Sequence, residues 1–195
     1  MKLPNRLFFT GVPGSKWSGI AQILESNDAF DTSDRTPERE YNHNQYSGHK
    51  GVYFGTGMEF PPDPTNVDQG WNEGTGIKLV KSHEWAYMLD VVKQTNPEDW
   101  IMLIYRPNEI SNKWWHQAGG FDITYPNYEY YQNSNNMYKA ICEQNENILK
   151  YAYRQNATWN YFTSEWIKTT FGLDIKVEPK YNDILVTVIK SNNAF

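Results

Sequence analysis

The chain has 195 residues, which is enough for one domain with a sizeable buried core. Its formal net charge of −5 gives no overall positive field, so we expect it to bind neither a nucleic-acid backbone nor an anionic membrane surface. The single cysteine, Cys142, has no partner for an internal disulfide, and the apolar run at residues 7–9 is too short for a signal peptide or a membrane span. We therefore expect a soluble, cytoplasmic protein in which any anionic ligand is held by a local site.

The hydrophobic pattern predicts four buried strands, because four short apolar runs are bounded by turn or helix signals. These strands cover residues 7–12, 77–80, 100–105 and 158–162. Helix-like segments follow at 17–25, 84–95 and 107–118, and the clearest helix covers about 137–154. This alternation is typical of an α/β fold in three layers, with a mostly parallel central sheet and helices on both faces.

We expect residues 1–195 to form a single domain. Residues 27–76 interrupt the alternation with Gly, Pro, Asp and Asn throughout, and an irregular insertion of this length is usually a functional lid or a mobile segment. Near the C-terminus, residues 175–177 and 184–189 are predicted to form a hairpin.

The first predicted strand leads through a glycine-bearing loop into the first helix. The loop reads Gly11-Val12-Pro13-Gly14-Ser15-Lys16-Trp17-Ser18. A turn at such a junction points backbone N–H groups at an anion, and the helix N-terminus adds a positive partial charge. The segment resembles the P-loop of nucleotide triphosphatases, although Lys16 and Trp17 stand where that loop has Gly and Lys. The alternative is an ordinary strand–helix turn that binds nothing.

The same loop resembles the Pro-Lys-Ser-Gly-Thr-Thr loop of sulfotransferases, which binds the 5′-phosphate of phosphoadenosine phosphosulfate. Pro13, Ser15 and Ser18 align with the Pro, the Ser and the last Thr, while Gly14 stands at the position of the family lysine. The resemblance implies a P-loop-like strand–loop–helix unit whose residues from Pro13 to Ser18, Trp17 included, hold the donor. Lys16 would supply the displaced positive charge.

The second predicted strand ends in Lys78-Leu79-Val80-Lys81-Ser82-His83, which resembles the Lys-Thr-His segment of cytosolic sulfotransferases. In that family the histidine is the general base and the neighbouring lysine stabilises charge near the transferred group, so the resemblance implies these roles for His83 and Lys81. An imidazole titrates near neutrality and suits the removal of a proton from an attacking hydroxyl. The alternative is a histidine that caps a helix or lies on the surface.

The third predicted strand delivers Arg106 at its carboxyl end, where α/β sheets place ligands. The segment resembles the sulfotransferase motif whose arginine, with a serine eight residues later, binds the donor's 3′-phosphate. A guanidinium can hold a phosphate through two hydrogen bonds. Position 114 is Trp, so Ser111 or Lys113 takes the place of that serine in this interpretation. The alternative is that Arg106 ends the strand in a salt bridge.

Together these motifs imply a sulfotransferase that moves a sulfuryl group from phosphoadenosine phosphosulfate to a hydroxyl acceptor, either a carbohydrate or a small molecule. Adenosine 3′,5′-bisphosphate would be the product, and no metal is expected. Aromatic residues at 41–53 and 114–131 are candidates for the acceptor surface, while His43, His49 and His116 lack metal-ligand spacing. Two alternatives stay open: a P-loop kinase, which would need magnesium and a strand-end carboxylate, and a catalytically inactive nucleotide-binding protein with the same fold.

Overall fold

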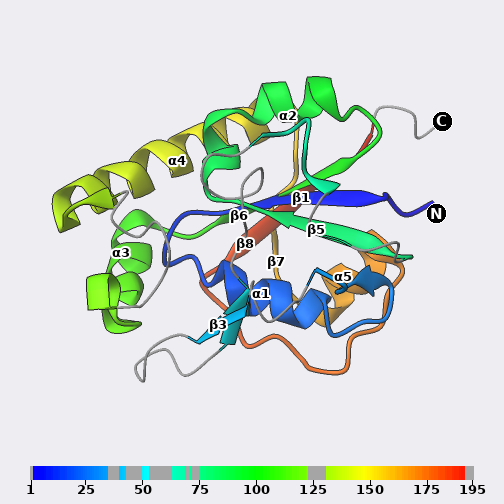
Figure 1. The fold of residues 1–195 in the computed structure, drawn as a ribbon, viewed down its shortest axis with the longest axis horizontal. Coiled ribbons are helices and arrows are strands. Elements are labelled where there is room, and N and C mark those ends of the chain that lie inside the picture. The colour runs from blue at the N-terminus through cyan, green and yellow to red at the C-terminus, as the bar shows by residue number, and fades with distance from the viewer. Residues whose placement is uncertain are drawn as a thin grey trace.

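The computed structural model describes residues 2–34, 40–42, 50–52, 63–68, 71, 75–122 and 131–191. Over these ranges the chain has an α/β fold with five α-helices and a mixed six-stranded sheet (Figure 1). The sheet strands are β1 (Arg6–Thr10), β2 (Phe30–Asp31), β5 (Ile77–Lys81), β6 (Trp100–Tyr105), β7 (Asn160–Tyr161) and β8 (Leu185–Ile189). The α-helices are α1 (Trp17–Leu24), α2 (Leu89–Thr95), α3 (Asn108–Gln117), α4 (Ser134–Arg154) and α5 (Ser164–Phe171).

The sheet has the order β2-β5-β1-β6-β8-β7. β1 lies between β5 and β6 and is parallel to both, so that Phe9 is opposite Lys81 on one side and Met102 on the other. β2 is parallel to β5, whereas β8 is antiparallel to both β6 and β7. The carboxyl ends of β5, β1 and β6 therefore meet at one edge of the sheet, which is where open α/β sheets bind ligands.

The predicted C-terminal hairpin is wrong. Residues 175–177 form no strand, and β8 pairs along its whole length with β6, from Tyr105 opposite Leu185 to Ile101 opposite Ile189. This pairing buries the apolar side chains of β8, including Val186, more completely than a two-stranded ribbon could.

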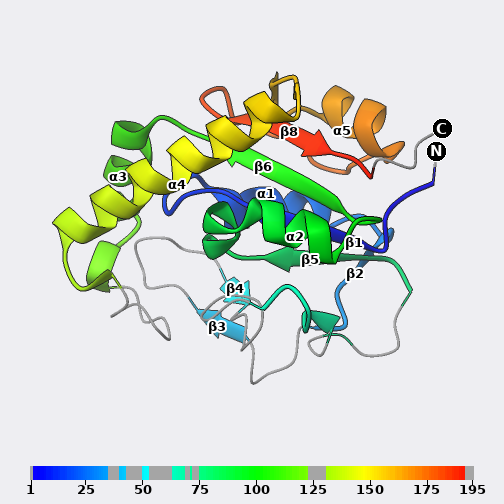
Figure 2. The same cartoon turned by 90° about the horizontal axis from the view of Figure 1, so that it is seen from above.

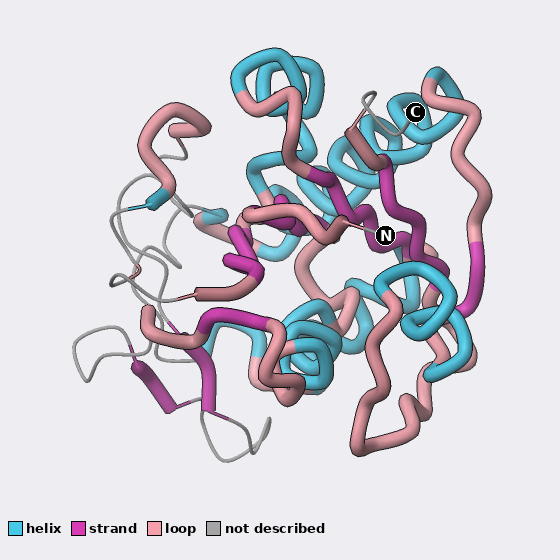
Figure 3. The backbone as a smooth tube through the Cα atoms, turned by 90° about the vertical axis from the view of Figure 1, so that its right-hand side faces the viewer, coloured by secondary structure: helices cyan, strands magenta, loops and turns pink. Residues whose placement is uncertain are grey.

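Successive side chains of the central strands point to opposite faces of the sheet and join two hydrophobic clusters. On one face Phe8, Val80 and Ile101 pack with residues of α2 and α4, such as Val92 and Ile148. The other cluster has strand residues Leu7, Phe9, Leu79 and Met102, α1 residues Ile20 and Leu24, and α5 residues Ile167 and Phe171. Figures 1 and 2 show α2 and α4 on the side of the sheet opposite to α1 and α5, and Figure 3 shows helical segments on both sides of the strands.

Helix boundaries follow local capping. α4 begins earlier than its apolar pattern suggests, because the Asn133 side chain accepts a hydrogen bond from the backbone N–H of Asn136. α5 begins in the same way at Thr163 and ends at Gly172, whose φ of 72° suits a residue without a side chain. The predicted helix over 84–95 is divided at Met88 into a 3₁₀ turn, η2 (Glu84–Tyr87), and α2. A second 3₁₀ turn, η3 (Gly120–Asp122), follows α3.

The expected insertion at 27–76 is described in part. It contains β2 and a separate antiparallel pair, β3 (Glu40–Asn42) with β4 (Lys50–Val52). Much of the remainder, including most of the aromatic stretch at 41–53 and both His43 and His49, lies outside the described residues.

Candidate functional site

The loop after β1 is a tight turn held between β1 and α3. The backbone N–H of Ser15 donates to the carbonyl of Val12 over 3.0 Å and closes the turn. Gly14 has a φ of +79°, and a Cβ atom at this position would overlap the backbone carbonyl of Ser111 in α3. Glycine is therefore required at position 14 both by the backbone conformation and by the close approach of α3.

The loop leads directly into the N-terminus of α1. Lys16 occupies the N-cap position in the left-handed conformation, with a φ of 59°, and its side chain makes no capping hydrogen bond. The Ser15 hydroxyl is fully buried and has no hydrogen-bond partner among the described residues. It lies against Gly11, where a Cβ atom would come within 2.8 Å of the Ser15 Oγ. A buried hydroxyl without a partner at a helix N-terminus is suited to an anionic ligand.

His83 lies two residues after the end of β5 and is hydrogen-bonded to this loop. Its Nδ1 is hydrogen-bonded to the carbonyl oxygen of Gly11, and because a carbonyl only accepts, Nδ1 carries the proton and Nε2 keeps its lone pair. The Trp17 ring lies against the imidazole with 4.0 Å between centroids, and Trp17 in turn stacks on Phe9. Burial lowers the pKa of His83 to about 4, although the hydrogen bond to Gly11 opposes this shift. His83 is thus a neutral proton acceptor at pH 7.

Lys81 points away from the loop. Its ammonium forms an ion pair of 2.8 Å with Glu25, and at least 95% of each side chain is buried. Glu25 is the C-cap of α1, so it lies about 12 Å along the helix from the loop, since an α-helix of eight residues rises about 1.5 Å per residue. The structure therefore places the charge of Lys81 in a buried pair rather than beside His83.

Arg106 connects the end of β6 to the loop. Its Nη1 donates to the carbonyl of Gly14 over 2.8 Å, while Nε and Nη2 donate to Oδ2 of Asp183 over 2.9 and 2.5 Å. The Arg106 backbone carbonyl accepts hydrogen bonds from Asn145 and from the Ser111 hydroxyl. Arg106 thus makes the strand-end salt bridge that was the alternative to phosphate binding, and Ser111 supports the turn after β6.

The side chain of Lys16 lies over two aromatic rings beside the loop. Its Nζ is 4.4 Å from the centroid of Trp114 and 5.6 Å from that of Tyr181. Burial lowers the pKa of Lys16, the charge of Arg106 lowers it further, and the carboxylate of Asp183 opposes both effects. Lys113, on the same helix as Trp114, is exposed. The structure therefore brings together Lys16, Arg106, Ser15 and His83 around the loop, but not Lys81.

Two residues of this site, Tyr181 and Asp183, were missed by sequence analysis. Both lie between α5 and β8, in the segment that connects the two strands of the predicted hairpin. Asp183 reaches Arg106 because it lies two residues before Leu185, the first residue of β8, which pairs with Tyr105 at the end of β6. The carboxylate of Asp183 just before a predicted strand indicated a possible ion pair. The sequence did not identify Arg106 as its partner, because that contact depends on the pairing of β6 with β8.

Among the expected acceptor aromatics, Trp114 lies at the loop, whereas Trp115 is buried and makes an edge-to-face contact with Phe121. His116 is exposed. Three members of that stretch, Tyr125, Tyr128 and Tyr130, lie outside the described residues.

Scans of the chain against protein-family models, curated proteins and solved structures give no match. Within the described ranges, no helix has both the length and the hydropathy needed to cross a lipid bilayer. In the same ranges, no three side chains of His, Cys, Asp or Glu gather as metal ligands do. The function must therefore be argued from the geometry of the strand-end site.

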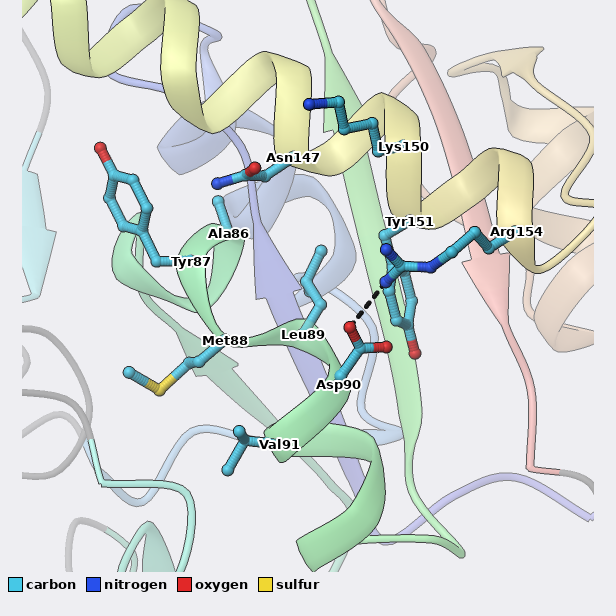
Figure 4. A pocket seen from close by; sticks show the side chains of 10 residues that line it. All are labelled: Ala86, Tyr87, Met88, Leu89, Asp90, Val91, Asn147, Lys150, Tyr151 and Arg154. Atoms are coloured by element: carbon cyan, nitrogen blue, oxygen red, sulfur yellow. Dashed lines mark hydrogen bonds and ion pairs between the residues drawn. The ribbon is translucent and has the colours of Figure 1, made fainter.

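Two hollows lie away from this edge of the sheet. The first, of about 250 Å³, is bounded by η2, α2 and α4, and Figure 4 shows the ion pair of 2.6 Å between Arg154 and Asp90 at its side. The second, of about 460 Å³, lies between the end of α4, α5 and β8 and includes Trp166 and Lys190. Neither hollow includes a residue that the sequence motifs singled out.

Proposed function

We propose that this protein is a sulfotransferase that moves a sulfuryl group from phosphoadenosine phosphosulfate, or a closely related adenosine donor, to a hydroxyl acceptor. The observation that carries the proposal is the hydrogen bond between His83 Nδ1 and the carbonyl of Gly11. It holds a neutral imidazole, with Nε2 as the proton acceptor, against the loop that is suited to an anion. A base next to an anion loop is the pairing that transfer of an anionic group to a hydroxyl requires.

The loop supplies the donor site in this proposal. The residues from Pro13 to Ser18 would surround the 5′-phosphate, with the buried Ser15 hydroxyl donating to it and the N-terminus of α1 contributing its partial charge. The proposal treats the strand, loop and helix as a P-loop-like unit at the N-terminus of a three-layer fold. The two hydrophobic clusters on opposite faces of the sheet support that arrangement.

The acceptor hydroxyl attacks the sulfur while His83 Nε2 takes its proton. The bond between the sulfur and the bridging oxygen of the donor breaks, and the electron pair leaves with the adenosine phosphate. Lys16 stabilises the negative charge on this leaving oxygen. A pKa of about 4 makes free His83 a weak base, but the negative charge of a bound donor raises the pKa toward neutrality, where general bases work best.

Two observations bear on the alternative functions, a P-loop kinase and an inactive nucleotide-binding protein. Asp31, a buried carboxylate at the end of β2, favours a kinase, but β5 separates β2 from β1, which puts the two strands about 10 Å apart at a spacing of about 4.8 Å per strand. The ion pairs of Lys81 and Arg106 favour an inactive nucleotide-binding protein, because they engage two of the expected charges.

Calorimetry with adenosine 3′,5′-bisphosphate, and separately with ATP and magnesium, distinguishes the three functions. We expect the bisphosphate to bind and ATP with magnesium to bind weakly. Transfer of labelled sulfate to a panel of phenols and sugars should then be at least 100-fold slower in His83→Gln, whereas Lys150→Gln, a variant of an exposed lysine of α4, should keep its rate. Tight ATP binding would favour the kinase. Bisphosphate binding without any transfer would favour the inactive protein.

A further inference from the structure

The guanidinium of Arg106 is already occupied by an anion of the protein itself. Only 5% of the Arg106 side chain is exposed, and its ion pair with Asp183 has an N–O distance of 2.5 Å. The hydrogen bond from Nη1 to Gly14 fills a third position of the guanidinium. Three of the five guanidinium N–H groups are thus engaged within the protein, and the small exposed fraction leaves little surface for a phosphate of a ligand while Asp183 is in place.

The other candidates for a second phosphate site are also engaged or exposed to solvent. The hydroxyl of Ser111 is buried and donates to the backbone carbonyl of Arg106. Lys113 is exposed, and no resolved contact directs its ammonium toward the loop. Among the described residues, two cations, Lys16 and Arg106, and one carboxylate, Asp183, lie at the loop, so their summed charge is +1 rather than +2. That charge matches one anionic group at the loop better than two.

We propose that Asp183 takes the place of a second ligand phosphate, so that the site binds an adenosine donor through its 5′-phosphate group alone and does not select for a 3′-phosphate. This inference rests on the proposed function. It assigns the donor to the class of adenosine 5′-phosphosulfate, with or without a phosphate on the 3′-oxygen. Asp183 acts through Arg106: it neutralises the buried guanidinium, which in turn holds the loop carbonyl of Gly14.

Calorimetry of the full chain with adenosine 5′-monophosphate and with adenosine 3′,5′-bisphosphate tests the inference. For the wild-type protein we expect dissociation constants within about threefold of each other, because Asp183 repels the additional phosphate. In Asp183→Asn the bisphosphate should bind at least about tenfold more tightly than in the wild type, because Arg106 is no longer neutralised, while the monophosphate should change by less than about threefold.

Asp174→Asn is the matched control. Asp174 lies in the same segment between α5 and β8 and forms an ion pair of 2.8 Å with Lys168, but 80% of its side chain is exposed. This variant should leave both dissociation constants unchanged. It separates the effect at Arg106 from the general loss of one negative charge.

A wild-type protein that binds the bisphosphate more than about tenfold tighter than the monophosphate overturns the inference and leaves the proposed function standing. Absence of binding by both nucleotides removes the proposed function, and the inference with it. The two dissociation constants of the wild-type protein test the inference even if Asp183→Asn does not fold. An equal gain for both nucleotides in Asp183→Asn also contradicts a role specific to the second phosphate.

Discussion

Nη1 of Arg106 donates a hydrogen bond of 2.8 Å to the carbonyl oxygen of Gly14, and this contact joins the end of β6 to the loop after β1. Gly14 is also in close contact with the backbone of Ser111, one turn into α3. The loop is therefore held from two sides by the β6–α3 unit. Its shape depends on residues that lie more than 90 positions away in the sequence.

Gly14→Ala should destabilise the protein more than Gly172→Ala. Both glycines have similar left-handed angles, +79° and +72°, so both variants bear the same backbone penalty of about 1–2 kcal/mol. Only at Gly14 does the new Cβ atom meet the carbonyl of Ser111, whereas nothing lies within 4 Å at Gly172. Urea denaturation should show a further loss of about 1–3 kcal/mol for Gly14→Ala. Equal losses would mean that α3 can move away from the loop.

Ser15→Ala should weaken ligand binding without weakening the fold. Because the Ser15 Oγ has no partner among the described residues, its removal costs no hydrogen bond of the folded protein and relieves a buried polar atom. We expect unchanged or slightly higher stability and about tenfold weaker binding of adenosine 5′-monophosphate. Ser111→Ala is the contrasting variant, because its hydroxyl donates to Arg106, and it should lose about 1 kcal/mol. A large loss of stability in Ser15→Ala would contradict the assignment.

His83 should make the stability of the protein depend on pH between 6.5 and about 4. The folded-state pKa of about 4 is below the ordinary value of 6.5, so the unfolded chain binds the proton more readily within this window. The free energy of unfolding is then highest above pH 6.5 and falls as the pH decreases, by up to about 3 kcal/mol at about 1.4 kcal/mol per unit.

Urea denaturation at a series of pH values measures this contribution as the difference between the wild type and His83→Gln. The difference should change across the window, because the imidazole that titrates there is removed in His83→Gln. A difference that does not vary with pH would show that the His83 imidazole is accessible to protons in the folded state.

The buried pair of Lys81 with Glu25 predicts non-additive variants. Lys81→Met alone leaves the Glu25 carboxylate buried without its cation and should cost about 3–5 kcal/mol. The double variant Lys81→Met, Glu25→Leu should recover most of this loss, because no uncompensated charge remains. For the exposed pair of Lys150 with Glu146, Lys150→Ala should cost less than about 1 kcal/mol. Denaturant midpoints of the wild type, Lys81→Met, Glu25→Leu and the double variant complete the cycle, and an additive result would place Lys81 outside a buried pair.

The sequence predicted several elements to within a residue or two where a local signal was strong. β6 matches its predicted range. Five of its six residues are buried and apolar, and such a continuous apolar run is typical of a strand covered on both faces. α3 starts directly after Pro107, which the sequence placed in the first turn and which occupies the N-cap, one position earlier. In contrast, the division of residues 84–95 at Met88 has no comparable local signal.

By itself the sequence determined the α/β alternation and placed Lys16, His83 and Arg106 at strand ends, because apolar runs and turn residues act over a few neighbouring positions. Only the tertiary structure decided which charges those residues meet. Arg106 finds Asp183, 77 positions away, because β8 pairs with β6, and Lys81 finds Glu25 across the face of α1. Such partners depend on strand order and on which side of the sheet a side chain faces, and these follow from packing the whole chain rather than from any one segment.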